Sequence, residues 1–124
     1  MSAIEIGTQL VQLCSAGKSD QAHDDLYDEK IVSIEGQGSE EMPARLEGLA
    51  AIRGKSKWWE ENHEVHGNTV VGPFCGHRED QFAMHFVMDV TPKATGERTQ
   101  LNEVALYTVA NGKIVQEEFL YLMA

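Results

Sequence analysis

The sequence predicts an α+β domain, with helices packed on one face of a curved antiparallel sheet. Apolar residues recur at helical spacing in the first half of the chain. From His63 onward, apolar and polar residues alternate as they do in strands. Near the end, Asn111-Gly112 separates two alternating runs, and this pair suits the positive φ angles of a two-residue hairpin turn. Helices followed by strands indicate this fold class.

The first helix is predicted from a single apolar stripe near the N-terminus. Ile6, Leu10 and Cys14 recur at helical spacing, and Gly17 is placed to end the helix. Cys14 therefore reads as a small buried hydrophobe, and we expect it to be a reduced thiol, like the other cysteine, Cys75.

Two further helices are predicted before the sheet begins. The second covers Ser19–Tyr27, with Ser19 as its cap, and the third covers Leu49–Asn62. A short strand at Ile31–Ile34 and a loop at Gln37–Pro43 separate them.

Three long strand regions follow. The first is Val65–Phe74, and the second runs through Phe82–Val90, where one face has far more apolar bulk than the other. The closing hairpin pairs Leu101–Ala110 with Lys113–Leu122. We expect residues 1–124 to form one domain, because this length suits a single core and contains no repeat or linker.

Composition and charge exclude several classes of partner. The formal net charge of −10 disfavours nucleic acid and anionic membrane, which select basic surfaces. No apolar stretch approaches the roughly 20 residues that span a bilayer, and the N-terminal residues lack the pattern of a signal peptide. We therefore expect a cytoplasmic protein. No glycine-rich phosphate loop or metal cluster is present, so we expect no cofactor and no metal.

The closing hairpin carries the strongest candidate for chemistry. If Ala110 faces Lys113, then Ala105 opposes Glu118, and Glu103 is a diagonal neighbour of Glu118 roughly 7–8 Å away. Besides these two carboxylates, the same hairpin face contains mostly apolar side chains and one phenol: Leu101, Tyr107, Val109, Ile114, Leu120 and Leu122.

Two nearby carboxylates on an apolar wall cannot both ionise easily, so the pKa of one of them should rise. We therefore assign Glu118 as a general base, Glu103 as a general acid and the Tyr107 hydroxyl as an oxyanion donor. The alternative is that these residues lie hydrated at the open end of the sheet.

A small apolar or aromatic molecule would be the ligand of such a face. The side chains expected to contact it are Tyr27, Trp59, His63, Met84, Phe86, Leu120 and Leu122. Plain core packing is the alternative for the apolar members, and a structural role is the alternative for His63. His63 and His66 point to opposite faces of a strand, which argues against a shared metal ion.

The other face of the sheet is apolar enough to need a cover. On the register above, it presents Val104, Phe119 and Tyr121 of the hairpin, together with His85 of the preceding strand. A homodimer formed through this outer face is expected.

The chain resembles the nuclear transport factor 2-like superfamily, which includes the SnoaL-like polyketide cyclases and the ketosteroid isomerases. The resemblance rests on Leu26-Tyr27-Asp28, on Gly48–Ile52 at the start of the third helix, and above all on the closing stretch Tyr107–Val115. It implies a cystatin-like, cone-shaped sheet with the helices on its concave face, an enclosed ligand cavity and a homodimer. It also implies that Ile114, Glu118 and Leu122 point inward. The cyclases have an acid where this chain has Leu122, so that acid is absent here.

Two classes of function follow. The first is a small-molecule-binding domain with an apolar cavity that acts as a cofactor-free isomerase, cyclase or hydratase through carboxylate acid–base chemistry. The second is a non-catalytic ligand-binding or dimeric accessory domain on the same cone.

Overall fold

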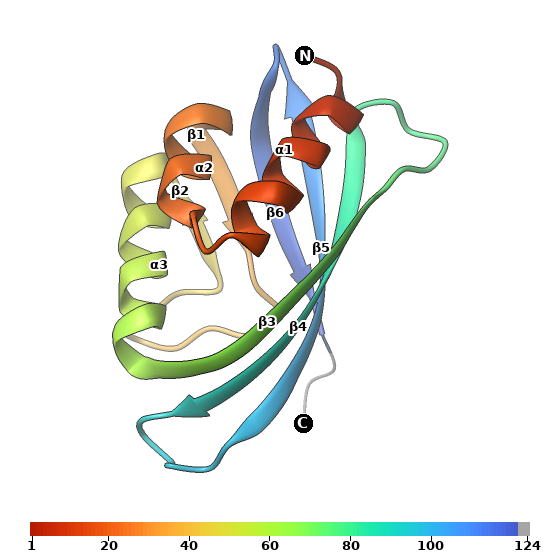
Figure 1. Cartoon of the computed structure of the whole chain (residues 1–124). Helices are drawn as coiled ribbons and strands as arrows, with labels where there is room; N and C mark the ends of the chain where they lie inside the picture. The colour runs from red at the N-terminus through yellow and green to blue at the C-terminus, as the bar shows by residue number, and fades with distance from the viewer. Residues whose placement is uncertain (122–124) are drawn as a thin grey trace.

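The computed structural model describes residues 1–121 and confirms the α+β fold class (Figure 1). The helices are α1 (Ala3–Ser15), α2 (Ser19–Leu26) and α3 (Leu49–Asn62). The strands are β1 (Tyr27–Ile34), β2 (Arg45–Glu47), β3 (His63–Phe74), β4 (Gln81–Pro92), β5 (Thr99–Ala110) and β6 (Lys113–Leu120). All three helices cover the same side of one strongly curved sheet.

The sheet is mixed rather than purely antiparallel. Its strand order is β2-β1-β6-β5-β4-β3, and β1 runs parallel to β6 while the other neighbouring pairs are antiparallel. The prediction of an antiparallel sheet is therefore wrong at this one junction, which joins the helical half of the chain to the closing hairpin. The short strand β2 was also missed, because its three residues follow directly on a loop.

Local sequence signals explain where α1 begins and how closely it packs. The Ser2 side chain accepts from the Glu5 backbone N–H, and the Glu5 side chain caps Ser2 in return. Ile6 and Leu10 are fully buried. A Cβ at Gly7 would lie 2.8 Å from the Pro73 side chain, so only glycine lets α1 approach β3 this closely.

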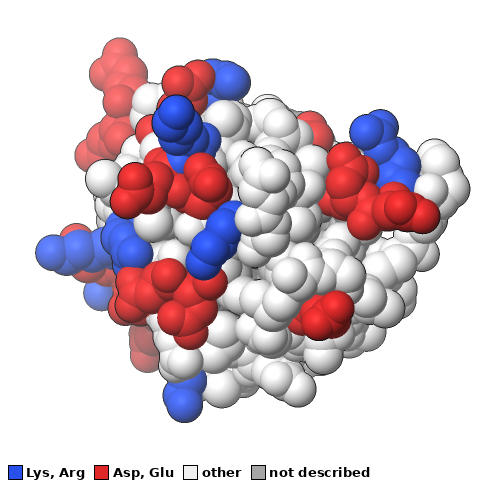
Figure 2. Space-filling view, turned by 90° about the horizontal axis from the view of Figure 1, so that it is seen from above, with Lys and Arg blue, Asp and Glu red and all other residues white. Residues whose placement is uncertain are grey.

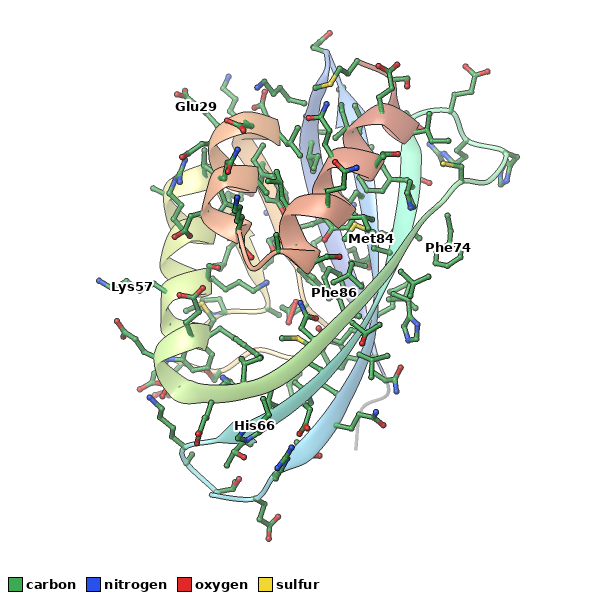
Figure 3. The ribbon with its side chains drawn as sticks, in the orientation of Figure 1. Glu29, Lys57, His66, Phe74, Met84 and Phe86 are labelled. Atoms are coloured by element: carbon green, nitrogen blue, oxygen red, sulfur yellow. The ribbon has the colours of Figure 1, made fainter. Side chains whose placement is uncertain are left out.

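The concave face is filled at one end and half open at the other. Near α1, the β4 side chains of Phe82 and Met84 are buried, whereas Phe86, two residues further along, is only half-buried. Figure 3 shows Met84 and Phe86 on the helix-covered side of the sheet. The neighbouring strand β5 shows the same change: Tyr107, opposite Phe82, is buried, and Glu103, opposite Phe86, is half-buried. The core therefore sits under α1 and α2, and a less covered region lies beyond it.

On the face seen from above, charged side chains are most crowded on one flank, and a smaller group lies on the opposite flank (Figure 2). The crowded flank is the side where α2 and α3 lie, while an uncharged area extends across the middle. Within residues 1–121, no helix has the length and apolar character needed to cross a membrane.

Candidate functional site

A buried carboxylate, Glu117 of β6, lies at the centre of the concave face. It is 4% exposed, and both of its oxygens accept hydrogen bonds from hydroxyl groups. The Tyr27 hydroxyl donates to Oε1 at 2.6 Å, and the Ser33 hydroxyl donates to Oε2 at 2.8 Å. The parallel pairing of β1 with β6 places Ser33 directly beside Glu117. Two short hydrogen bonds to the charged group offset the cost of burying it.

One cation, Lys55 of α3, reaches this cluster from the helical layer. Its Nζ donates to Ser33 Oγ at 3.0 Å and forms an ion pair with Glu35 Oε2 at 3.2 Å. The same ammonium lies 4.6 Å from the centre of the Phe119 ring. Both partners of the ion pair are largely buried, with 15% of the Lys55 side chain and 21% of the Glu35 side chain exposed. This pair is therefore less screened by water than a surface ion pair.

A second half-buried carboxyl, Glu103 of β5, lies toward the open end of the concave face. Its direct neighbour across the strand pair is Phe86. The pKa of Glu103 is raised to about 7, mainly by burial and also by the Glu35 carboxylate, while the Lys55 ammonium acts in the opposite direction. Burial also raises the pKa of Glu35, and Lys55 again opposes the shift. Glu103 thus exchanges its proton near neutral pH, as a general acid or base must.

The predicted register of the closing hairpin holds at the turn and is wrong beyond it. Ala110 pairs with Lys113 as predicted. Asn111 and Gly112 have φ angles of 52° and 75°, as the turn requires. The register then shifts between Thr108 and Val109, where a bulge adds one residue to β6.

The bulge turns every later β6 side chain to the opposite face. Glu118 pairs with Leu106 on the outer face, instead of opposing Ala105 on the concave face. Of the two adjacent glutamates, it is Glu117, paired with Tyr107, that points inward and is buried. The assignment of Glu118 as the base of an inward-facing pair therefore fails on geometry.

Two other predictions change with the same bulge. Leu120 lies on the outer face and is 48% exposed, so it does not line the concave face. Phe119 turns inward instead of forming the outer surface, since it pairs with Ala105 and packs against the core. Tyr121 lies past the end of β6, and its hydroxyl accepts a hydrogen bond from the Gln37 backbone N–H at 3.3 Å. Leu122, predicted to contact ligand, lies outside the described residues.

The remaining candidates divide between the filled and the open parts of the concave face. Tyr27, Met84 and Tyr107 are buried in the core, at 8%, 0% and 2% exposure. The Tyr107 ring stacks on Phe82 with centroids 5.0 Å apart, and burial raises its pKa well above the usual value. Tyr107 therefore keeps its proton, but its position in the core leaves it remote from an entering ligand.

Trp59 and His63 form a stacked pair where α3 passes into β3. Their rings are 4.2 Å apart and inclined by 10°, and His63 Nδ1 lies 2.8 Å from the Trp59 carbonyl oxygen. Both side chains are half-buried. His66 contacts Thr91 at 2.8 Å instead. In the described part of the chain, no three His, Cys, Asp or Glu side chains are placed to hold a metal ion.

Glu103 also borders an open hollow of about 700 Å³ at the point where β6 ends. The hollow is lined by residues from both faces of the sheet: His85, Gln100, Leu101, Asn102, Glu103, Val104, Leu120 and Tyr121. A carboxyl with a raised pKa beside an opening is a candidate for reaction with a bound molecule.

Sequence reasoning missed Glu35, Lys55, Ser33 and Glu117. Ser33 lies in β1, Glu35 directly follows that strand, Lys55 lies in α3 and Glu117 in β6, and long-range pairing brings them together. One signal was present: Ile114 and Phe119 are both apolar and five residues apart. An odd spacing cannot put both on one face of a regular strand, so a bulge is required if both are buried.

Comparison with known proteins shows close similarity over nearly the whole chain. Residues 1–121 match the family described as SnoaL-like domain. The structure of a candidate SnoaL-like polyketide cyclase from Mesorhizobium loti is 45% identical in sequence, with a TM-score of 0.90 over 98% of this chain and 100% of that one.

More distant structures share the fold alone. A candidate polyketide cyclase from Pseudomonas putida is 18% identical, with a TM-score of 0.73 over 99% of this chain and 93% of that one. A protein of unknown function with a cystatin-like fold from Xanthomonas campestris is 14% identical, with a TM-score of 0.77 over 97% and 90%. No curated protein matches the sequence.

Proposed function

This chain belongs to the SnoaL-like domain family, and on that basis we propose that it binds a small apolar or aromatic molecule on its concave face and moves a proton on it, as an isomerase, cyclase or hydratase does. The observation that supports this proposal is Glu103, a half-buried carboxyl at the open end with its pKa raised to about 7. Half-buried Phe86 and Leu101 supply apolar surface beside it.

Glu103 takes the role of general base that the sequence prediction gave to Glu118, and Glu35 is the second carboxyl that acts on it. In the proposed reaction, the ionised Glu103 carboxylate removes a proton from a carbon next to a carbonyl group. The C–H electron pair moves into the resulting enolate, and Glu103 then returns the proton to the same or another carbon of that enolate. Glu35 keeps a second negative charge nearby, which favours the protonated form of Glu103. This chemistry requires no cofactor.

Proton exchange on a simple ketone tests the proposal without knowledge of the natural substrate. In D₂O near pH 7, the protein should accelerate deuterium exchange at the α-carbons of 2-tetralone, followed by proton NMR. Glu103→Gln should reduce that acceleration by about 100-fold or more. Glu118→Gln is the matched control, because Glu118 faces outward, and should stay within about twofold of wild type.

Binding separates the catalytic proposal from the non-catalytic alternative. The planar phenol 2-naphthol has the shape of the enol of 2-tetralone, so it should bind and quench the tryptophan fluorescence. Binding of 2-naphthol without any exchange of 2-tetralone would favour a ligand-binding domain. An unchanged exchange rate in Glu103→Gln would remove Glu103 from the reaction.

We also propose that a second copy of the chain covers the outer face of the sheet. Val104 and Leu120 pair directly across β5 and β6, and they are 39% and 48% exposed. His85, across from Val104 on β4, is held at 2.6 Å from the Asn102 side chain. Adjacent exposed apolar side chains on the outer face of the sheet suit a partner surface.

Sedimentation equilibrium measures this association. Wild type should have the mass of a dimer, and Leu120→Glu should shift it to a monomer, because the new charge would be buried without a partner. A monomeric wild type, or a Leu120→Glu variant that remains dimeric, would show that this face is not the interface.

A further inference from the structure

Lys55 connects two largely buried carboxylates of the concave face, Glu117 through the Ser33 hydroxyl and Glu35 directly. On one side its ammonium donates to the Ser33 hydroxyl, and on the other it pairs with Glu35. A serine hydroxyl has one proton. Because Ser33 Oγ accepts from Lys55, its own proton is left to donate to Glu117, at 2.8 Å. The direction of this hydrogen-bonded chain is therefore set at Lys55.

The surroundings of Lys55 restrict where its charge can lie. The ammonium rests 4.6 Å from the centre of the Phe119 ring, and its side chain is 15% exposed. The neighbouring Lys57 is exposed and points away from the sheet (Figure 3). Of these two lysines on α3, only Lys55 contributes charge to the concave face.

Several titratable groups act on the Glu103 and Glu35 carboxyls from the elements packed around them. They are Lys55 from α3, Glu117 from β6 and Tyr121 after β6, besides the effect of the Glu35 carboxylate on Glu103. Lys55 supplies the one positive charge in this set. Its removal should leave the acidic groups to repel one another.

We propose that Lys55 is a positioning residue of the site, which fixes the Ser33 hydroxyl as a donor to Glu117 and holds the Glu35 carboxylate ionised beside Glu103. This inference rests on the proposed function, since it assigns Lys55 the task of deciding which carboxyl carries the proton. Lys55 acts through its neighbours and does not itself exchange a proton with the ligand.

Carboxyl titration by ¹³C NMR of glutamate-labelled protein tests the inference apart from any reaction. In Lys55→Met, the titration midpoint of Glu35 should rise by about one pH unit or more, and that of Glu103 should rise by less. Lys55→Arg should restore both midpoints to within about half a unit, because it keeps the charge. Lys57→Met is the matched control and should leave both unchanged.

The pH profile of 2-tetralone exchange gives the second measurement. Its midpoint should move to higher pH in Lys55→Met and return in Lys55→Arg, a shift that a merely structural role would not produce. Unchanged carboxyl midpoints in Lys55→Met would overturn the role of Lys55 even if exchange is catalysed. If the carboxyl midpoints shift in Lys55→Met but wild type does not catalyse 2-tetralone exchange, the positioning role of Lys55 is supported and the proposed reaction is refuted.

Discussion

Replacing Glu117 by alanine lowers the free energy of unfolding by about 3 kcal/mol, because the change leaves buried donors without an acceptor. The Tyr27 and Ser33 hydroxyls both donate to this carboxylate, and Ser33 is fully buried. Urea unfolding followed by circular dichroism measures the loss.

Glu118→Ala is the matched control, since the two glutamates are adjacent and differ in the face they occupy. Glu118 is paired with Leu106 on the outer face, and its loss should change the unfolding free energy by less than about 0.5 kcal/mol. Glu117→Gln keeps the volume of the side chain and one acceptor oxygen, so its free energy of unfolding should lie between those of wild type and Glu117→Ala. A larger loss in Glu118→Ala than in Glu117→Ala would restore the regular hairpin register and refute the bulge.

Glu103→Gln makes the protein more stable than wild type at high pH and leaves the two equal at low pH. The pKa of Glu103 is raised from 4.5 to about 7 in the folded protein. Between these pH values the folded state binds more protons than the unfolded state, so stability falls as pH rises through this window. Well below pH 4.5 both states are protonated, and the shift costs nothing.

The expected size follows from the shift. At about pH 8 the ionised Glu103 lowers the stability of wild type by at most roughly 3 kcal/mol, and less to the extent that solvent reaches this half-buried group. Glutamine imitates the protonated carboxyl, so the difference between Glu103→Gln and wild type should grow from near zero at pH 4.5 to about 2 kcal/mol at pH 8.

Urea unfolding at several pH values gives this difference directly. Glu103→Leu also lacks the carboxyl. Its difference from wild type in free energy of unfolding should change with pH in the same way as that of Glu103→Gln, offset by a constant amount. Curves for Glu103→Gln and wild type that run parallel over the whole range would show that Glu103 is not held protonated by its surroundings.

Local signals in the sequence predicted most of the secondary structure. The apolar stripe of α1 ends before Gly17, whose φ angle of 72° suits glycine. The range predicted for the third helix, Leu49–Asn62, is the range of α3. These predictions succeeded because each depends on residues a few positions apart.

The second helix shows where such local reasoning ends. It stops at Leu26, and Tyr27 already opens β1, where it pairs with Ile114 of β6. Tyr27 continues the apolar spacing of the second helix, but in the structure it is the first residue of β1. Its cap was also misplaced by one residue, since Lys18 and not Ser19 precedes the helix.

The candidate site was predicted less well, because it depends on register and on pairing across the whole chain. Alternation alone could not place the bulge in β6, since Glu117 and Glu118 are adjacent and identical in chemistry. Ser33 and Glu117 are 84 residues apart, and the parallel pairing that joins them has no turn sequence to reveal it. Glu103, by contrast, lies on β5, which the bulge does not lengthen, and its inward position follows from regular alternation along that strand.

The central claim is that the concave face holds a carboxyl that exchanges its proton near neutral pH, and a ¹³C NMR titration of the wild-type protein tests it most directly. Comparison with the Glu103→Gln spectrum assigns the resonance. The account predicts a Glu103 midpoint near pH 7. A midpoint close to 4.5, the ordinary value for a glutamate in water, would contradict the buried setting of Glu103 and the acid–base function built on it.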